Sequence, residues 1–190
     1  MNKVIQGDCL EVMPNFPDKS IDMILCDLPY GTTACKWDTI IPFEPLWKEY
    51  KRIIKDNGAI VLTASQPFTT VLINSNFKMF KYELIWEKDR PTGLFTAKIQ
   101  PMKAHENILV FGKGKVKYNP QKWEGLMESH KRGRSTAQSE HYKNAKFSQE
   151  TTGTTKYPRS VLFFKKEIPP PHQTAKPVAL FEYLIKTYTN

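Results

Sequence analysis

The sequence predicts an α/β fold in which helices cover both faces of a sheet. Over residues 3–112, short apolar runs of the strand type alternate with segments whose apolar residues recur at helical spacing. The first two of these runs are each followed by an aspartate, Asp8 and Asp27. The length of 190 residues suits one domain, or one domain with a substantial insertion.

The first predicted unit is a strand, a turn, a helix and a second strand. We expect a short strand at residues 4–5 and a short helix at 9–16 that ends because of Pro14 and Pro17. Residues 21–26 follow as a strand of the buried type.

The later elements continue the same alternation. In residues 46–54 the apolar side chains recur at helical spacing, and the Asp-Asn-Gly of 56–58 ends that helix. The remaining expectations are strands at 59–64, 82–87 and 107–111, a helix at 67–76, and a last helix marked by Val178, Leu180, Phe181, Leu184 and Ile185.

The composition changes after Gly112, which predicts three regions: 1–112, 113–166 and 167–190. Residues 113–166 hold thirteen Lys or Arg against four Glu, a surplus equal to the net charge of +9 of the whole chain. Aromatic residues lie among the basic ones, which suits contact with phosphates and bases. A solvated linker is the alternative interpretation. The aromatic residues are Trp123, Tyr142, Phe147 and Tyr157.

The charge, the cysteines and the apolar runs of the chain indicate its kind of partner and its compartment. A pI near 9.4 suits a polyanionic partner. Cys9, Cys26 and Cys35 lack zinc-type spacing, so we expect reduced thiols and no metal site. The sequence contains neither a secretion signal core nor a run of eighteen apolar residues, which predicts a cytoplasmic protein that does not span a membrane.

The tetrapeptide Asp27-Leu28-Pro29-Tyr30 carries the clearest chemical signal. It follows a predicted buried strand, at the edge where open α/β sheets bind ligands. An aromatic amino nitrogen is a poor nucleophile, and hydrogen bonds accepted by Asp27 and the Leu28 carbonyl would favour its attack on a methyl sulfonium. Pro29 would orient that carbonyl and Tyr30 would stack on a base taken out of the duplex. The same four residues also fit an ordinary turn at a strand end.

Asp8 has two interpretations. At the end of a strand beside that of Asp27, its carboxylate would accept a hydrogen bond from a nucleoside in the same crevice. As a single residue before Cys9, it would cap a helix N-terminus.

Four segments together resemble the DNA methyltransferases that methylate exocyclic amino groups. They are Gly-Asp-Cys-Leu at 7–10, Asp-Leu-Pro-Tyr-Gly at 27–31, the helix and strand of 47–62, and His-Gln-Thr-Ala-Lys-Pro at 172–177. The order resembles the permuted branch of that family, in which the catalytic Asp-Pro-Pro-Tyr-type motif comes first, a target-recognition insert follows, and the motifs that bind S-adenosylmethionine (SAM) come last.

The resemblance implies a Rossmann-like SAM-dependent methyltransferase sheet with residues 113–166 as the basic target-recognition insert and double-stranded DNA as the partner. The tetrapeptide would be catalytic. The implied cofactor-binding residues are Asp8, Cys9, His172, Thr174, Lys176 and Pro177, and the expected DNA contacts are Lys131, Arg132, Arg134, Lys143 and Lys146.

The chain departs from the family pattern in two places. Gln173 and Ala175 replace the Pro and Gln of the usual His-Pro-Thr-Gln-Lys-Pro motif, and Lys176-Pro177 by itself would also suit a plain helix start. The family's Phe-x-Gly-x-Gly cofactor loop does not occur before Asn190. We therefore expect an incomplete sheet with an open edge, and reduced stability or self-association of the isolated chain.

The leading hypothesis is a methyltransferase specific for N6 of adenine, of the kind found in restriction-modification systems, because an aspartate opens the tetrapeptide in most adenine enzymes of the family. Cytosine-N4 methylation is the second hypothesis. A truncated, non-catalytic DNA-binding module is the third, and an RNA or small-molecule amine methyltransferase is the fourth.

Overall fold

A computed structural model describes residues 3–125, 154–169 and 174–190. The chain divides into two compact units. The larger combines Met1–Asn119 with Ser160–Asn190, and the smaller is Pro120–Arg159.

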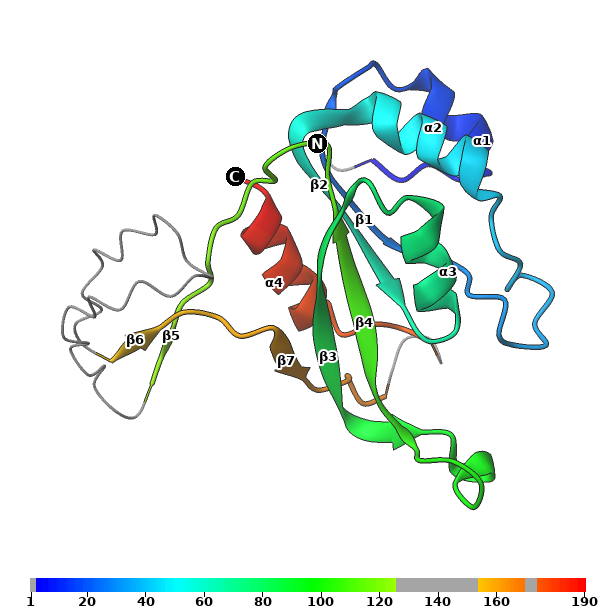
Figure 1. Cartoon of the computed structure of the whole chain (residues 1–190), viewed down its shortest axis with the longest axis vertical. Helices are drawn as coiled ribbons and strands as arrows, with labels where there is room; N and C mark the ends of the chain where they lie inside the picture. Colours follow the sequence, from blue (N-terminus) through cyan, green and yellow to red (C-terminus); the bar gives the residue numbers. More distant parts are fainter. Residues whose placement is uncertain (1–2, 126–153, 170–173) are drawn as a thin grey trace, which may run out of the picture. The chain divides into compact units, whose positions relative to one another are not determined.

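The larger unit is built on a five-stranded mixed sheet in the order β1-β2-β4-β3-β7 (Figure 1). β1 pairs with β2 in parallel, β4 runs antiparallel to both of its neighbours, and β7 runs parallel to β3. Four of the five strands therefore point the same way, and β4 opposes them. The strands are β1 Ile21–Asp27, β2 Ile54–Ala64, β3 Phe80–Thr92, β4 Lys103–Phe111 and β7 Val161–Phe164.

Helices cover both faces of this sheet, as the sequence predicts. On one face, α2 (Phe43–Ile53) and α3 (Phe68–Ser75) pack in a first core. The short helix α1 (Cys9–Val12) and the 3-10 turn Met13–Asn15 contribute side chains to the same core. On the other face, α4 (Val178–Tyr188) packs in a second core. Burial of apolar side chains on both faces stabilises the layered arrangement.

Strand β2 contributes apolar side chains to the cores on both faces of the sheet. Its side chains alternate between the two cores: Ile60 and Leu62 enter the core under α2, whereas Ala59 and Val61 enter the core under α4. Successive side chains on a strand point to opposite faces, so a strand buried on both faces is a continuous apolar run. The run 59–64 meets this requirement, with Thr63 as its one polar residue.

β1 differs from β2 because it lies at the edge of the sheet. Among the described residues it pairs on one side only, with β2, and none of its residues is fully buried. β1 and β7 are therefore the two edge strands of the main sheet among the described residues.

Most predicted elements form, and two predictions are wrong. The Asp-Asn-Gly of 56–58 does not end the second helix: α2 already ends at Ile53, and residues 56–58 lie inside β2, which starts at Ile54. The expected strand at residues 4–5 is absent: Val4 is 97% exposed and the segment has no strand partner. A two-residue strand needs a neighbour to satisfy its backbone groups, and β1 pairs with β2 instead. β3 and β4 extend well beyond the predicted 82–87 and 107–111, as a long hairpin, and β7 lies within the basic segment 113–166 yet joins the main sheet.

The smaller unit contains a two-stranded antiparallel sheet of β5 (Trp123–Glu124) and β6 (Thr155–Lys156). The Lys122 ammonium lies 4.6 Å from the centroid of the Tyr157 ring. The predicted DNA contacts Lys131, Arg132, Arg134, Lys143 and Lys146 lie outside the described residues.

Two kinds of feature are absent from the described residues. No helix there is long and apolar enough to cross a bilayer. Nor do those residues contain a group of three or more His, Cys, Asp or Glu side chains arranged to hold a metal ion. All three cysteines are free thiols.

Candidate active site

Asp27 ends β1 and faces Thr63 near the end of β2. Its carboxylate accepts hydrogen bonds at both oxygens. Oδ1 accepts from the Tyr30 hydroxyl at 2.9 Å and from the Thr63 hydroxyl, and Oδ2 accepts from Lys176 Nζ at 2.7 Å. The Asp27 side chain is nonetheless 33% exposed, so a ligand can approach it.

The Tyr30 ring lies beside the Asp27 carboxylate and packs against α3. It stacks on Phe68, the first residue of α3, with centroids 5.2 Å apart and planes 22° apart. Lys176 Nζ lies 5.5 Å from the centroid of the Tyr30 ring, within cation–π range. Burial raises the pKa of Tyr30 well above its usual value, and the Asp27 charge raises it further. The Tyr30 hydroxyl therefore remains a donor at neutral pH.

Lys176 connects Asp27 to a second, more deeply buried ion pair. Its ammonium lies 3.5 Å from Glu106 Oε2, and Glu106 Oε1 in turn lies 3.4 Å from Lys88 Nζ. The side chains of Lys176, Glu106 and Lys88 are 8%, 15% and 3% exposed. Burial lowers the pKa of Lys88, while the Glu106 charge opposes that shift. Two carboxylates and two ammonium groups thus alternate along one cluster.

Glu106 Oε2 has no geometrically adequate hydrogen bond, although Lys176 lies within ion-pair distance. A buried carboxylate oxygen normally has a hydrogen-bond partner, and unsatisfied ones often mark functional sites. Glu106 Oε2 therefore has the capacity to accept one further hydrogen bond.

The loop that follows Tyr30 is anchored by Asp38. Its carboxylate accepts hydrogen bonds from the backbone N–H groups of Gly31, Thr32 and Thr33 and from the Thr33 hydroxyl, at 2.8 to 2.9 Å. Burial alone would raise the pKa of Asp38, but these four hydrogen bonds outweigh it and lower the pKa to about 2. Gly31 adopts a φ of +65°, where a Cβ would also contact Ile40 at 2.9 Å, so glycine is required there.

The other predicted cofactor-binding residues lie in different settings. Asp8 caps α1 by accepting the Leu10 N–H at 2.8 Å, which is the helix-cap alternative of its two interpretations. Cys9 is half-buried, and burial raises the pKa of its thiol. Pro177 is buried and immediately precedes α4, and Thr174 is exposed. His172 lies outside the described residues.

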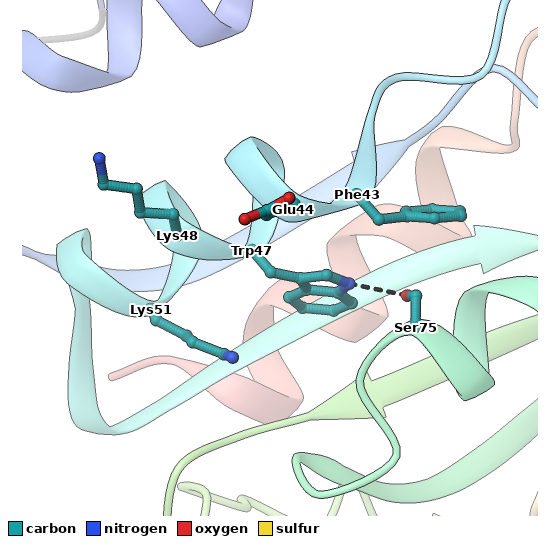
Figure 2. Close-up of a pocket in the computed structure, with 6 residues that line it drawn as sticks. All are labelled: Phe43, Glu44, Trp47, Lys48, Lys51 and Ser75. Carbon is teal, nitrogen blue, oxygen red and sulfur yellow. Dashed lines mark hydrogen bonds between the residues drawn. The ribbon is translucent and has the colours of Figure 1, made fainter.

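A separate hollow of about 470 Å³ lies between α2 and α3 (Figure 2). Within it the Trp47 indole N–H donates to the Ser75 hydroxyl at 2.7 Å. None of the predicted catalytic or cofactor-binding residues lines it; the lining residues are Phe43, Glu44, Trp47, Lys48, Lys51 and Ser75.

The structure adds residues that sequence reasoning missed. Thr63 could have been found, because it is a hydroxyl near the end of a predicted buried strand, on the same edge as Asp27. Asp38 follows the tetrapeptide closely, but aspartate is common in loops. Lys88, Glu106 and Phe68 carry no local signal, since only the fold brings Phe68 to Tyr30 and joins Glu106 and Lys88 to Asp27 through Lys176.

The chain is similar in sequence to known DNA methyltransferases. The N6_N4_Mtase family model, described as DNA methylase, matches residues 21–190. The chain is 30% identical over 121 residues to the type II methyltransferase M2.MboI of Moraxella bovis, covering 50% of this chain and 44% of that protein. It is 28% identical over 136 residues to M.HinfI of Haemophilus influenzae, with 57% and 37% coverage. The matched part thus spans less than half the length of these two relatives.

A further relative aligns over the whole chain. M1.MboII, also a type II methyltransferase of Moraxella bovis, is 23% identical over 226 residues, covering 100% of this chain and 80% of that protein.

Solved structures share the fold. The PvuII DNA methyltransferase (cytosine-N4-specific) superposes with a TM-score of 0.60 at 13% identity, covering 97% of this chain and 69% of that one. The M1.HpyAVI–SAM complex superposes with a TM-score of 0.57 at 18% identity, covering 98% and 76%. The sheet therefore has the Rossmann-like architecture of these methyltransferases. Because the family match includes every strand of the main sheet and the whole Asp27–Lys176 cluster, the chain belongs to the DNA methylase family of N6-adenine and N4-cytosine methyltransferases.

Proposed function

We propose that this chain transfers a methyl group from SAM to N6 of adenine in double-stranded DNA, and that it acts in the cytoplasm. The observation that carries the proposal is the position of the Asp27 carboxylate, at the end of β1 and in contact with Tyr30, Thr63 and Lys176. Family membership supports the reaction class, and the aspartate that opens the tetrapeptide favours adenine.

The chain's own residues would act on the amino group. Its N–H groups would donate to Asp27 and to the Leu28 carbonyl, which draws the nitrogen lone pair out of conjugation with the base. Tyr30, held by Phe68, would contact the face of the extruded adenine. The bond formed is N6–CH₃, the bond broken is the sulfonium S–CH₃ bond, and the surplus proton leaves to solvent.

The residues present fit the methionine part of SAM, which carries one carboxylate and one ammonium. Lys176 would bind the carboxylate, and the available Oε2 of Glu106 would accept from the ammonium. When bound, SAM supplies an electrophilic methyl group. Asp8, Cys9, His172, Thr174 and Pro177 stay predictions for the rest of the cofactor site.

Two alternatives remain open to test. Cytosine-N4 methylation would use the same amino-group chemistry. A non-catalytic DNA-binding module is favoured by one observation, the open edge of β1, because the strand that carries Asp27 pairs on one side only among the described residues.

Nucleoside mass spectrometry tests all three. Mixed-sequence duplex DNA is incubated with the full chain and SAM, beside an Asp27→Ala control. N6-methyladenine that disappears in the control is the expected result. N4-methylcytosine would replace the adenine assignment, and folded protein that binds DNA yet yields no methylated base would favour the non-catalytic module.

A further inference from the structure

The turn between β3 and β4 carries three large apolar side chains that are exposed. Leu94 is 72% exposed, Ile99 is 83% exposed and Phe95 is fully exposed. These three residues are termed the hairpin tip below. Large apolar side chains grouped on an exposed turn mark an interaction surface more often than single ones do.

The hairpin tip is a folded turn. Gly93, with a φ of +93°, opens the 3-10 turn Leu94–Thr96, and the Thr96 N–H and hydroxyl both donate to the Gly93 carbonyl. The Gln100 side chain donates to the Thr96 hydroxyl at 3.1 Å. These hydrogen bonds hold the backbone while the apolar side chains point outward.

The hairpin tip lies beyond the edge of the sheet that carries the candidate active site. In the strand register Asp27 faces Thr63, and that row continues through Ile108 to Leu84 on β3. β3 then runs on to Thr92, past Lys88 of the charged cluster. The four residues from Lys88 to Thr92 span about 13 Å. Figure 1 shows the hairpin extending past the ends of β1 and β2.

The charge around the hairpin tip favours a polyanion. Residues 90–103 contain three basic side chains and no acidic one. All three basic side chains, Arg90, Lys98 and Lys103, are exposed. The acid nearest in the sequence, Asp89, accepts a hydrogen bond from the Lys166 backbone N–H at 3.2 Å and lies 4.0 Å from Arg90.

We propose that the hairpin tip inserts Phe95, flanked by Leu94 and Ile99, into the DNA base stack at the position that the target base leaves. This inference rests on the proposed function, because methylation of a paired base requires its extrusion. Extrusion leaves two unstacked base faces, which an apolar wedge covers while neighbouring basic side chains contact phosphates. Because the hairpin continues beyond Lys88, the tip would enter the duplex while the extruded base reaches Asp27.

The test is fluorescence anisotropy with two duplexes of one mixed sequence, one intact and one with a central abasic site that mimics the vacated position. The full chain is compared with Phe95→Ala, Phe95→Trp and the matched control Phe77→Ala. Phe77 is also well exposed, at 70%, but it precedes β3, at the opposite end of that strand.

The wild type should prefer the abasic duplex by about tenfold, since stacking of one aromatic ring on a base has an effect of this size. Phe95→Ala should abolish this preference, whereas Phe95→Trp and Phe77→Ala should retain it. The inference is overturned if the wild type shows no preference, if Phe95→Ala keeps it, or if Phe77→Ala loses it equally. It is also overturned if Phe95→Ala only dissociates a dimer in sedimentation, which would make the tip a contact between copies of the chain.

The test distinguishes failure of the wedge proposal from failure of the proposed methyltransferase function. A Phe95-dependent preference without any methylated nucleoside would support the wedge and contradict the enzyme. Methylation that is unchanged in Phe95→Ala, with unchanged binding to both duplexes, would support the enzyme and overturn the wedge.

Discussion

Lys176 Nζ lies 2.7 Å from Asp27 Oδ2, although 149 positions separate the two residues in the sequence. Lys176 lies shortly before α4, the helix that packs on the face of the sheet opposite α2 and α3. Asp27 is the last residue of β1. The contact therefore connects the first and last parts of the larger unit, and it places a cation directly on the predicted catalytic carboxylate.

Replacing Lys176 by Met should destabilise the fold by about 2 kcal/mol, because it leaves Asp27 and Glu106 without their shared cation. The loss should be smaller in a Glu106→Gln background, where one carboxylate no longer needs compensation. Urea denaturation of the double-mutant cycle measures both effects. Lys186→Met is the control, since its pair with Glu182 is 60% exposed on both sides and should contribute less than about 0.5 kcal/mol. Additive losses would contradict the coupling.

Replacing Thr63 by Val should slow methyl transfer about tenfold, because Asp27 and Tyr30 lose the hydroxyl that bonds to both. The two side chains have nearly the same shape, so the fold should survive. Methyl incorporation into duplex DNA is compared with that of Thr70→Val, which removes an exposed hydroxyl on α3. Equal rates of methyl transfer in both variants would show that the Thr63 hydroxyl has no role in the reaction.

Asp38→Asn should reduce the free energy of unfolding by about 2 kcal/mol at pH 7, because one acceptor oxygen becomes a donor facing backbone N–H groups. The folded pKa of Asp38, about 2, lies below its ordinary value of 3.8. Its contribution is therefore complete above about pH 4 and is lost as the pH falls through 2. The difference between wild type and variant should shrink over that window in chemical denaturation. A difference that does not vary with pH would refute the charge assignment.

The open edge of β1 predicts self-association or low stability of the isolated chain. Sedimentation velocity over a range of concentrations, with a thermal unfolding scan, measures both. A cooperative transition together with a strictly monomeric mass would contradict the prediction.

Several elements were predictable because their signals are local. The apolar run of β1, the helical spacing of Leu46, Trp47 and Tyr50 in α2, and the apolar positions of α4 each appear in a short stretch of sequence. The strand predicted at residues 4–5 failed for the complementary reason: a strand depends on its partner, which no local pattern reveals.

The sequence by itself determined the α/β class, the two helical coverings and the tetrapeptide at the end of β1, because periodicity and strand-end chemistry are properties of neighbouring residues. Only the tertiary structure decided that Lys176, Glu106 and Lys88 join Asp27, that Phe68 supports Tyr30, and that β7 joins the sheet. These contacts depend on strand order and on the packing of α3 and α4, and such long-range relations leave no periodic mark in the sequence.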